Sequence, residues 1–265
     1  MKHRKYRFYK FFVRFFALLL SCVFLFGCSQ AGGTENNGQN ASQPVVANKK
    51  RVAITYDDGP HNVRTVQIVD EFAKYGFHAT FFVVGDRVAS VNGKKLTYSG
   101  ANALKYAVSK GHEIAIHGYT HKANYRECSY EVYKNELGNT KLAINKIVPD
   151  YKVKLMRPIG GSITDERVEE CPYAVILWDV DSEDWKYKDA SDDETSQKNT
   201  DKIVSNVMTN VSDGSIILMH DLYENTYEAT KIILKQLHEQ GYEVVTVSEL
   251  LGNNLSAGKK FSRKK

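Results

Sequence analysis

The chain has 265 residues, of which 42% are hydrophobic and 25% charged, so it carries enough apolar side chains for one large domain or two small ones. Its formal net charge is +5, but cations are concentrated in the first 14 and the last seven residues and leave residues 51–258 net acidic. An acidic body gives no reason to expect a nucleic-acid partner.

The N-terminal stretch is typical of an export signal. Residues 1–14 contain six Lys and Arg and no acid, and "FFALLLSCVFLFG" then forms an apolar run of 13 residues. That run is too short to span a bilayer but has the length of a signal-peptide core. It ends at "LFGC", which resembles a bacterial lipobox with Cys28 as the lipidated residue. An uncleaved signal anchor is the alternative, and both place the rest of the chain outside the cytoplasmic membrane.

Composition divides the chain into four parts. We predict a lipoprotein-type signal peptide over residues 1–27 and a flexible tether over residues 28–50, which are rich in Gly, Asn, Gln and Ser and show no apolar periodicity. One folded domain is predicted over residues 51–252. The remaining residues, 253–265, are predicted to be a basic, disordered tail.

The four cysteines bear on the redox environment. Cys22 lies in the signal and Cys28 is the predicted lipidation site, so Cys128 and Cys171 remain in the folded part. Outside the cell these two residues could form a disulfide, and two buried thiols are the alternative. Two cysteines at this separation form no metal signature.

The folded part alternates between apolar strand-like runs and amphipathic helix-like runs. Strands are predicted over 51–56, 78–85, 112–119, 154–158, 173–181 and 215–220, and a last apolar segment over 242–251 closes the domain. Helices are predicted over 63–76, 102–111, 129–148, 203–211 and 227–241. This alternation predicts an α/β fold of parallel strands with crossover helices, as an open sheet or a barrel. In such folds the chemistry gathers at the carboxyl ends of the strands.

Polar motifs follow the predicted strands at those ends. "TYDDGP" follows the first strand, and "HGYTH" holds His117 and His121 four residues apart, a spacing that one helical turn would bring to the same side. An Asp with two His is a common ligand set for a catalytic divalent metal. "RPIGG", "DSEDW" and "LMH" end three later strands. Each motif alone is weak, whereas their joint occurrence at strand ends indicates one site.

Together these motifs resemble the polysaccharide deacetylases of carbohydrate esterase family 4, the NodB homology domain, over about Arg51 to Leu251. The resemblance implies a distorted (β/α) barrel with fewer than eight strands as a single catalytic domain. It also implies metal-dependent removal of N- or O-acetyl groups from polysaccharide. The chain departs from the family pattern at Gly118, where Ser or Thr is usual, at Ile159, where a second Pro is usual, and at Gly160, where many members carry Tyr.

The resemblance also implies a role for each motif residue. Asp58, His117 and His121 would hold the metal, with Zn²⁺ expected and Co²⁺ as an alternative. Asp57 would be the general base and Arg157 its partner. His220 would be the general acid, held by Asp184. Trp185 and Leu218 would form the walls of the pocket that accepts the acetyl methyl group. Gly160 would offer a backbone N–H to the substrate.

We therefore expect a hydrolase acting on N-acetylglucosamine of peptidoglycan, anchored to the membrane by lipid and facing the cell wall, or secreted. Its partners would be the polysaccharide and the membrane, without nucleic acid, and it would act as a monomer. Chitin oligomers, xylan or an exopolysaccharide are alternative substrates. An exported carbohydrate-binding lipoprotein without turnover is the alternative of another class, and the paired base and acid argue against it.

Overall fold

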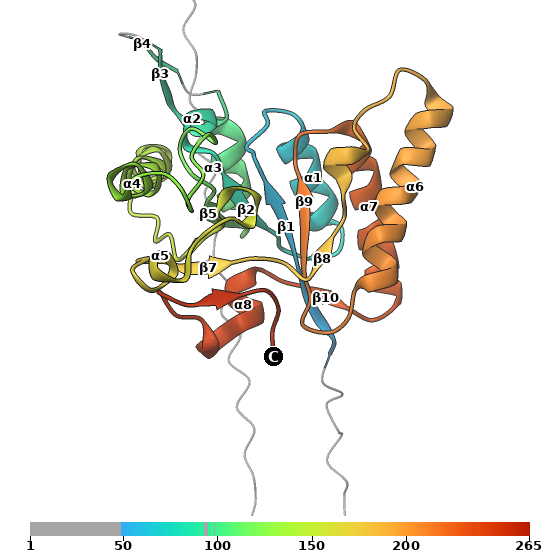
Figure 1. Cartoon of the computed structure of the whole chain (residues 1–265). Helices are drawn as coiled ribbons and strands as arrows, with labels where there is room; N and C mark the ends of the chain where they lie inside the picture. The colour runs from blue at the N-terminus through green and yellow to red at the C-terminus, as the bar shows by residue number, and fades with distance from the viewer. Residues whose placement is uncertain (1–48, 93–94, 98) are drawn as a thin grey trace, which may run out of the picture. The chain divides into compact units, whose positions relative to one another are not determined.

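The computed structural model describes residues 49–92, 95–97 and 99–265 (Figure 1). The predicted signal peptide, Cys28 and the tether up to residue 48 lie outside the described residues. Residues 47–265 form one compact unit, which extends past both ends of the predicted domain. Among the described helices, none combines the length and apolarity needed to cross a bilayer.

A parallel sheet of nine strands forms the centre of this unit. Its order is β11-β7-β6-β5-β2-β1-β9-β8, with β10 also paired to β1, and every pairing in it is parallel. The strands are β1 (Arg51–Asp57), β2 (Thr80–Val83), β5 (Glu113–Ile116), β6 (Leu155–Met156), β7 (Ala174–Ile176), β8 (Val180–Asp181), β9 (Ile216–His220), β10 (Glu243–Val244) and β11 (Lys260–Phe261). A separate antiparallel hairpin joins β3 (Ser90–Asn92) and β4 (Lys95–Thr97). The expected barrel-like α/β fold is confirmed as a half-barrel of parallel strands.

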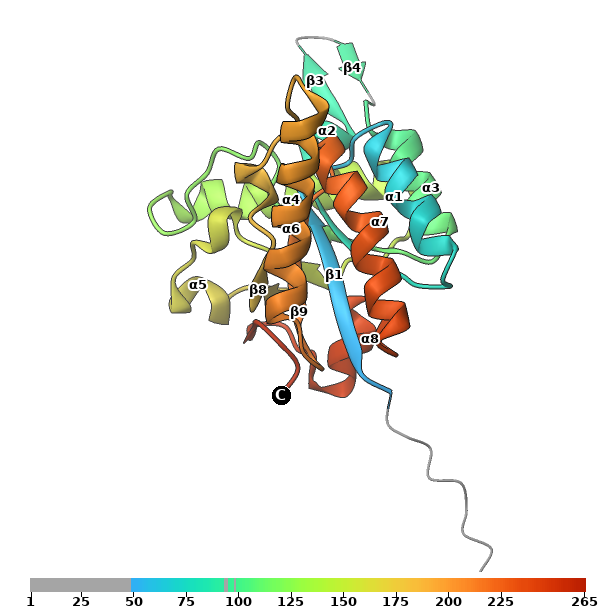
Figure 2. The same ribbon diagram turned by 90° about the vertical axis from the view of Figure 1, so that its right-hand side faces the viewer.

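Helices pack on the convex face of the sheet, where α6, α7, α1 and α3 lie next to one another (Figure 2). The helices are α1 (Arg64–Ala73), α2 (Gly85–Val88), α3 (Ala101–Ser109), α4 (Tyr130–Ile147), α5 (Asp165–Glu169), α6 (Asp193–Asn210), α7 (Glu224–Glu239) and α8 (Val247–Leu251). Three 3₁₀ turns complete the set: η1 (Ile159–Gly161), η2 (Asp184–Lys186) and η3 (Gly252–Asn254).

The alternation of side chains along β1 separates two cores. Val52, Ile54 and Tyr56 belong to the large cluster, whereas Ala53 belongs to a smaller cluster that includes residues of α8. Because successive strand residues point to opposite faces, Asp57 lies on the same face as Ala53. The first motif therefore begins with a carboxylate on the inner face of the sheet.

The structure departs most from the predicted elements in three places. Helix α6 begins at Asp193, ten residues before the predicted start, because Asp192 caps it and its first half is polar and mostly exposed. The predicted strand 173–181 is divided into β7 and β8. The apolar segment over 242–251 that was predicted to close the domain forms β10 and then α8, because Thr246 and Glu249 form a capping box.

The C-terminal tail corrects the prediction of disorder over residues 253–265. This segment forms η3 and β11, and the Phe261 carbonyl accepts a hydrogen bond from Leu177 N at 2.7 Å. Phe261 is half-buried against the smaller cluster, and Arg263 forms a bridge with Ser215. The tail is ordered because it pairs with the open backbone groups at the edge of β7. The composition of the tail alone gives no sign of this pairing.

The two cysteines of the folded part are free thiols. Cys171 is buried, and Cys128 is partly buried and accepts a hydrogen bond from Arg167 Nη1 at 3.2 Å. The sequence left open a disulfide or two thiols, and in the structure Cys128 and Cys171 are not bonded to each other.

Candidate active site

A pocket of about 370 Å³ opens at the carboxyl ends of the central strands. Eight of the residues predicted for the site line it: Asp57, Asp58, His117, His121, Gly160, Trp185, Leu218 and His220. Arg157 and Asp184 are fully buried and contact Asp57 and His220 respectively. Segments more than 150 residues apart in the chain thus converge on one rim, as the parallel sheet requires.

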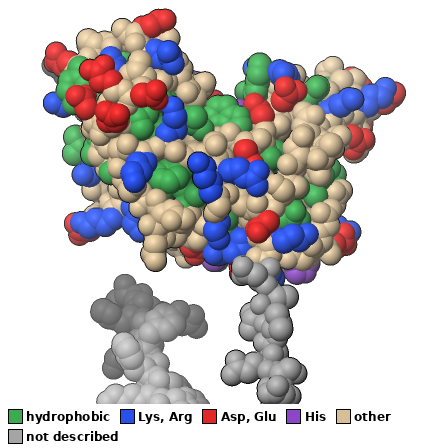
Figure 3. Space-filling view, turned by 60° about the horizontal axis from the view of Figure 1, so that its bottom comes forward, with side chains coloured by type: hydrophobic (Ala, Val, Ile, Leu, Met, Phe, Trp, Pro, Cys, Tyr) green, Lys and Arg blue, Asp and Glu red, His purple; other side chains and the backbone are tan. Residues whose placement is uncertain are grey.

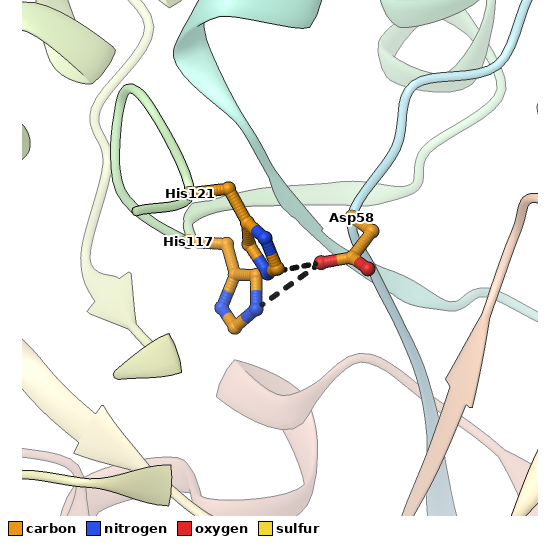
Figure 4. A group of neighbouring side chains, drawn as sticks. All are labelled: Asp58, His117 and His121. Carbon is orange, nitrogen blue, oxygen red and sulfur yellow. Dashed lines mark ion pairs between the residues drawn. The ribbon is translucent and has the colours of Figure 1, made fainter. Parts of the chain in front are cut away.

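The three predicted metal ligands lie together (Figure 4). Their ligand atoms are within 4.8 Å of one another, and Asp58 Oδ1 lies 3.4 Å from His117 Nε2 and 2.8 Å from His121 Nε2. Asp58 Oδ1 is buried yet makes no hydrogen bond with the described residues, so the 2.8 Å contact lacks hydrogen-bond geometry. A buried anionic oxygen and two imidazole nitrogens directed at one point fit a divalent cation.

Two of these ligands depend on unusual backbone. Asp58 has φ of 72° and His121 has φ of 57°, both in the left-handed region that non-glycine residues seldom adopt. Residues 117–121 form a loop rather than the expected helical turn. Gly118, with φ of 92°, turns the chain within this loop. The two imidazoles therefore meet through a strained loop and not through helical spacing, and such strain is typical of functional sites.

Protonation states at the triad suit metal binding. Burial lowers the pKa of His117 and so favours the neutral imidazole, although Asp57 and Asp58 oppose the shift. The ring of His117 is also oriented, because its Nδ1 lies 3.0 Å from the Arg157 carbonyl. With Nδ1–H donating to that carbonyl, Nε2 is left as the lone-pair atom that faces Asp58. Burial raises the pKa of Asp58, but His121 and His117 outweigh it and hold that pKa well below its usual range.

Arg157 is fully buried and every part of its guanidinium has a partner. Nη1 donates to Asp57 Oδ1 at 2.7 Å and to Thr55 Oγ1 at 2.8 Å. Nε and Nη2 donate to the carbonyls of Ile176 and Leu177, each at 3.1 Å. This network neutralises a buried cation and leaves Asp57 Oδ2 as the carboxylate oxygen nearer the triad, 3.6 Å from His117 Nε2.

The half-buried His220 and the buried Asp184 form the second pair of the site. His220 Nδ1 lies 2.7 Å from Asp184 Oδ1, while Asp184 Oδ2 accepts from the His220 backbone N and from Thr226 Oγ1. Burial lowers the pKa of His220, but Asp184 and the two carboxylates of the first motif outweigh it and raise the pKa to about 9. The Nδ1 contact with Asp184 leaves Nε2 for the pocket, so His220 can act as a proton donor there.

The walls of the pocket include residues that the sequence analysis missed. Leu218 is buried and Trp185 is 46% exposed, so they line the inner and outer parts of the wall. Trp178, Asp181 and Ile159 also line the pocket. Trp178 stands directly before the Asp-Val-Asp segment that ends a predicted strand, a position that would have indicated the rim.

Asp221 was also missed, although it directly follows His220. It is fully buried and accepts a hydrogen bond from Thr65 Oγ1 through Oδ2, and its other oxygen has no partner among the described residues. Burial raises its pKa to about 7. A Cβ atom at Gly59 would lie 2.3 Å from both oxygens of Asp221, so the turn of the first motif requires glycine there.

Glu136 holds the loop between the two histidine ligands. It projects from α4, is buried, and accepts hydrogen bonds from Tyr119 N at 2.6 Å, Thr120 N at 2.9 Å and Thr120 Oγ1 at 2.7 Å. A Cβ on Gly118 would lie 2.6 Å from Tyr125 Oη and 3.0 Å from Glu136 Oε2. The glycine that departs from the family pattern is therefore explained by its φ and by the close approach of these side chains.

Glu136→Gln should weaken metal binding. The substitution keeps the volume but removes the charge and places an amide NH₂ group where backbone donors now meet oxygen. We expect a ten- to hundredfold lower affinity for Zn²⁺, as is usual when the support of a ligand is lost, measured by competition with a chelating dye. Glu131→Gln, in the first turn of the same helix, is the matched control. Wild-type affinity in the Glu136 variant would contradict this role.

Comparison with known proteins agrees with the geometry. Residues 45–175 match the family described as Polysaccharide deacetylase. The peptidoglycan-N-acetylmuramic acid deacetylase PdaC of Bacillus subtilis is 38% identical over 208 residues, which are 78% of this chain and 40% of that protein. This chain thus spans about two fifths of the first curated relatives it matches.

Other relatives are covered almost completely. A peptidoglycan-N-acetylglucosamine deacetylase of Bacillus cereus is 34% identical over 215 residues, which are 78% of this chain and 91% of that protein. The structure described as "T48 deacetylase with substrate" superposes with a TM-score of 0.69 at 32% identity, over 81% of this chain and 97% of that one. Because a relative that this chain covers over 91% of its length is 34% identical, the chain belongs to the polysaccharide deacetylase family.

Proposed function

We propose that this protein is a metal-dependent hydrolase that removes N-acetyl groups from cell-wall polysaccharide, with N-acetylglucosamine of peptidoglycan as its substrate. The observation that carries the proposal is the presence of two separate ion pairs, Asp57 with Arg157 and His220 with Asp184, at one pocket with the candidate metal triad. A binding protein needs neither a positioned base nor a positioned acid.

Asp58, His117 and His121 are the residues that would hold the metal, and Zn²⁺ is the proposed ion, with Co²⁺ as the alternative, because one carboxylate and two imidazoles leave open positions. Such an ion would polarise the acetyl carbonyl and lower the pKa of a bound water to about 7. The chain supplies the remaining steps through its own side chains.

Asp57 is the proposed general base. Its Oδ1 is held by Arg157, so Oδ2 is the atom that takes the proton of the attacking water. His220 is the proposed general acid: Asp184 holds Nδ1, and Nε2 protonates the leaving amine nitrogen. The amine is a poor leaving group without that proton, so an amide substrate needs both groups.

Leu218 and Trp185 are proposed to enclose the acetyl methyl group. Gly160 is proposed to offer its backbone N–H to the oxygen that gains charge in the transition state. Gly160 has φ of 60°, and no atom lies within 4 Å of where its Cβ would stand, so the groove is open there. The names of the relatives, which act on two different sugars of peptidoglycan, support peptidoglycan as the polymer.

Asp57→Asn tests the proposal on purified peptidoglycan. We expect acetate release to fall by a factor of about 10² to 10⁴, while zinc content stays that of the wild type. Chelation should abolish wild-type release and added Zn²⁺ should restore it. Chitopentaose and acetylxylan assayed in parallel separate the alternative substrates. A variant as fast as the wild type would refute the role of the base, and binding without acetate release would refute the hydrolase.

The pH profile tests the acid. His220 acts in its protonated form, so kcat should fall as pH rises through its pKa, which Asp184 holds up. Asp184→Asn removes that charge and should move the alkaline limb of kcat to lower pH. The measurement is acetate release between pH 6 and 10, in buffers of constant ionic strength. An alkaline limb at the same pH in both proteins would exclude His220 as its origin.

We also propose that the protein is an extracytoplasmic lipoprotein, carried by a cleaved signal and anchored through Cys28, and that it acts as a monomer because one chain supplies the whole site. The apolar run ending at "LFGC" supports this proposal. Cys28→Ala should abolish incorporation of labelled fatty acid and shift the protein from the membrane fraction to the medium, as immunoblots would record. Unchanged labelling would overturn the anchor, and a dimer in sedimentation equilibrium would overturn the monomer.

A further inference from the structure

The end of the domain opposite the pocket is built from the first and the last described residues. β1 runs from Arg51 to Asp57, so the strand separates the two ends by roughly 20 Å. The Arg51 carbonyl accepts from Gly214 N, and the Gly214 carbonyl accepts from Lys264 N, each at 2.8 Å. The entry of the chain and its C-terminal segment therefore meet at one turn. We call this surface the basal face.

Cations gather on the basal face, where Figure 3 shows Lys and Arg side chains close together. Its basic residues are Lys49, Lys50, Arg51, Lys259, Lys260, Arg263, Lys264 and Lys265. Three of them have acidic partners: Arg51 lies 3.2 Å from Glu243, Lys260 lies 2.9 Å from Asp165, and Arg263 lies 3.6 Å from Asp179.

The other cations are available to a partner. Among the described residues, Lys49, Lys259, Lys264 and Lys265 form no ion pair, and all four are exposed. Lys50 Nζ lies 4.1 Å from the ring centre of Tyr242. Unpaired ammonium groups give up no internal ion pair when they meet an external anion, so no such loss opposes binding of an anionic partner.

A recess of about 480 Å³ beside the C-terminal segment combines charge with apolar surface. Leu177, Leu251 and Phe261 line it together with Lys260, Arg263 and Lys265. A hydrophilic polyphosphate would satisfy the cations but leave the apolar lining without a partner. An amphiphile with an anionic head satisfies both parts of the lining.

We propose that the basal face binds the anionic headgroups of a lipid bilayer. Each Lys near such a surface is attracted to it, and the attraction decays within a Debye length. The catalytic pocket, at the other end of β1, then points away from the membrane. This inference does not depend on the deacetylase reaction, since it uses none of the residues of the pocket.

The test uses residues 47–265, which lack the apolar N-terminal run that would itself enter lipid. We expect this domain to fold without further segments. The solved T48 deacetylase chain matches it over 97% of its own length and so contains little besides the domain. Cosedimentation with phosphatidylcholine vesicles, with and without phosphatidylglycerol, gives the partition coefficient. We expect binding only to the anionic vesicles and a large loss of binding in 0.5 M salt.

The variant carries Lys259→Gln, Lys264→Gln and Lys265→Gln. A loss of about fivefold in partition coefficient for each lysine removed predicts a value about a hundredfold lower for the triple variant. The control carries the same charge change at exposed residues of α3 and α4: Lys105→Gln, Lys134→Gln and Lys141→Gln. It should bind as the wild type does. Both triple variants should keep wild-type acetate release from soluble chitooligosaccharide, which separates this proposal from the catalytic one.

Three outcomes would overturn the proposal. Equal binding to neutral and anionic vesicles, or none to either, removes the headgroup as partner. An equal loss in the control shows net charge acting rather than this face. Tighter binding to soluble poly(glycerol phosphate) than to vesicles, at equal phosphate concentration, assigns the face to a polymer instead of a membrane.

Discussion

The buried Arg157 is the group on which the rest of the site depends. Its guanidinium joins β1 to the segment after β7 through Asp57, Thr55 and two carbonyls, while its own backbone carbonyl orients His117. One residue therefore positions the proposed base and one proposed metal ligand together. A cation that is fully removed from water is tolerated only because each part of it finds a partner. Loss of that residue would leave Asp57 as an uncompensated buried charge.

Carboxylates further from the pocket support the proposed metal ligands in the same way. Glu136 satisfies the backbone donors of the loop that carries His121, and Asp221 packs beneath the turn that follows Asp58. Asp58 and His121 adopt backbone conformations that are unfavourable for their residue types. Surrounding hydrogen bonds and packing must therefore hold Asp58 and His121 in these conformations. Holding them costs part of the free energy that stabilises the fold.

The parallel sheet also gives the domain two unlike ends. Carboxylates and imidazoles collect where the strands end, and cations collect where β1 begins and β11 runs along the edge. Because all nine strands run the same way, the chemistry is confined to one rim and the opposite rim is free to evolve as a contact surface. The distribution of charge thus follows the direction of the strands, and the two proposed partners, the polysaccharide and the membrane, would meet opposite ends of the domain.

Alternating apolar and amphipathic runs predicted the parallel α/β fold, and the polar motifs at strand ends, with the family that they resemble, predicted the residues that meet at the pocket. Both are local signals in the sequence. Glu136 and Asp221 escaped that reasoning, since their importance lies in contacts made across the fold. The strand β11 escaped it too, because only the open edge of β7 makes a polar tail ordered. Local patterns decide which elements form; the partners of buried charges and exposed strand edges are decided only when distant segments pack together.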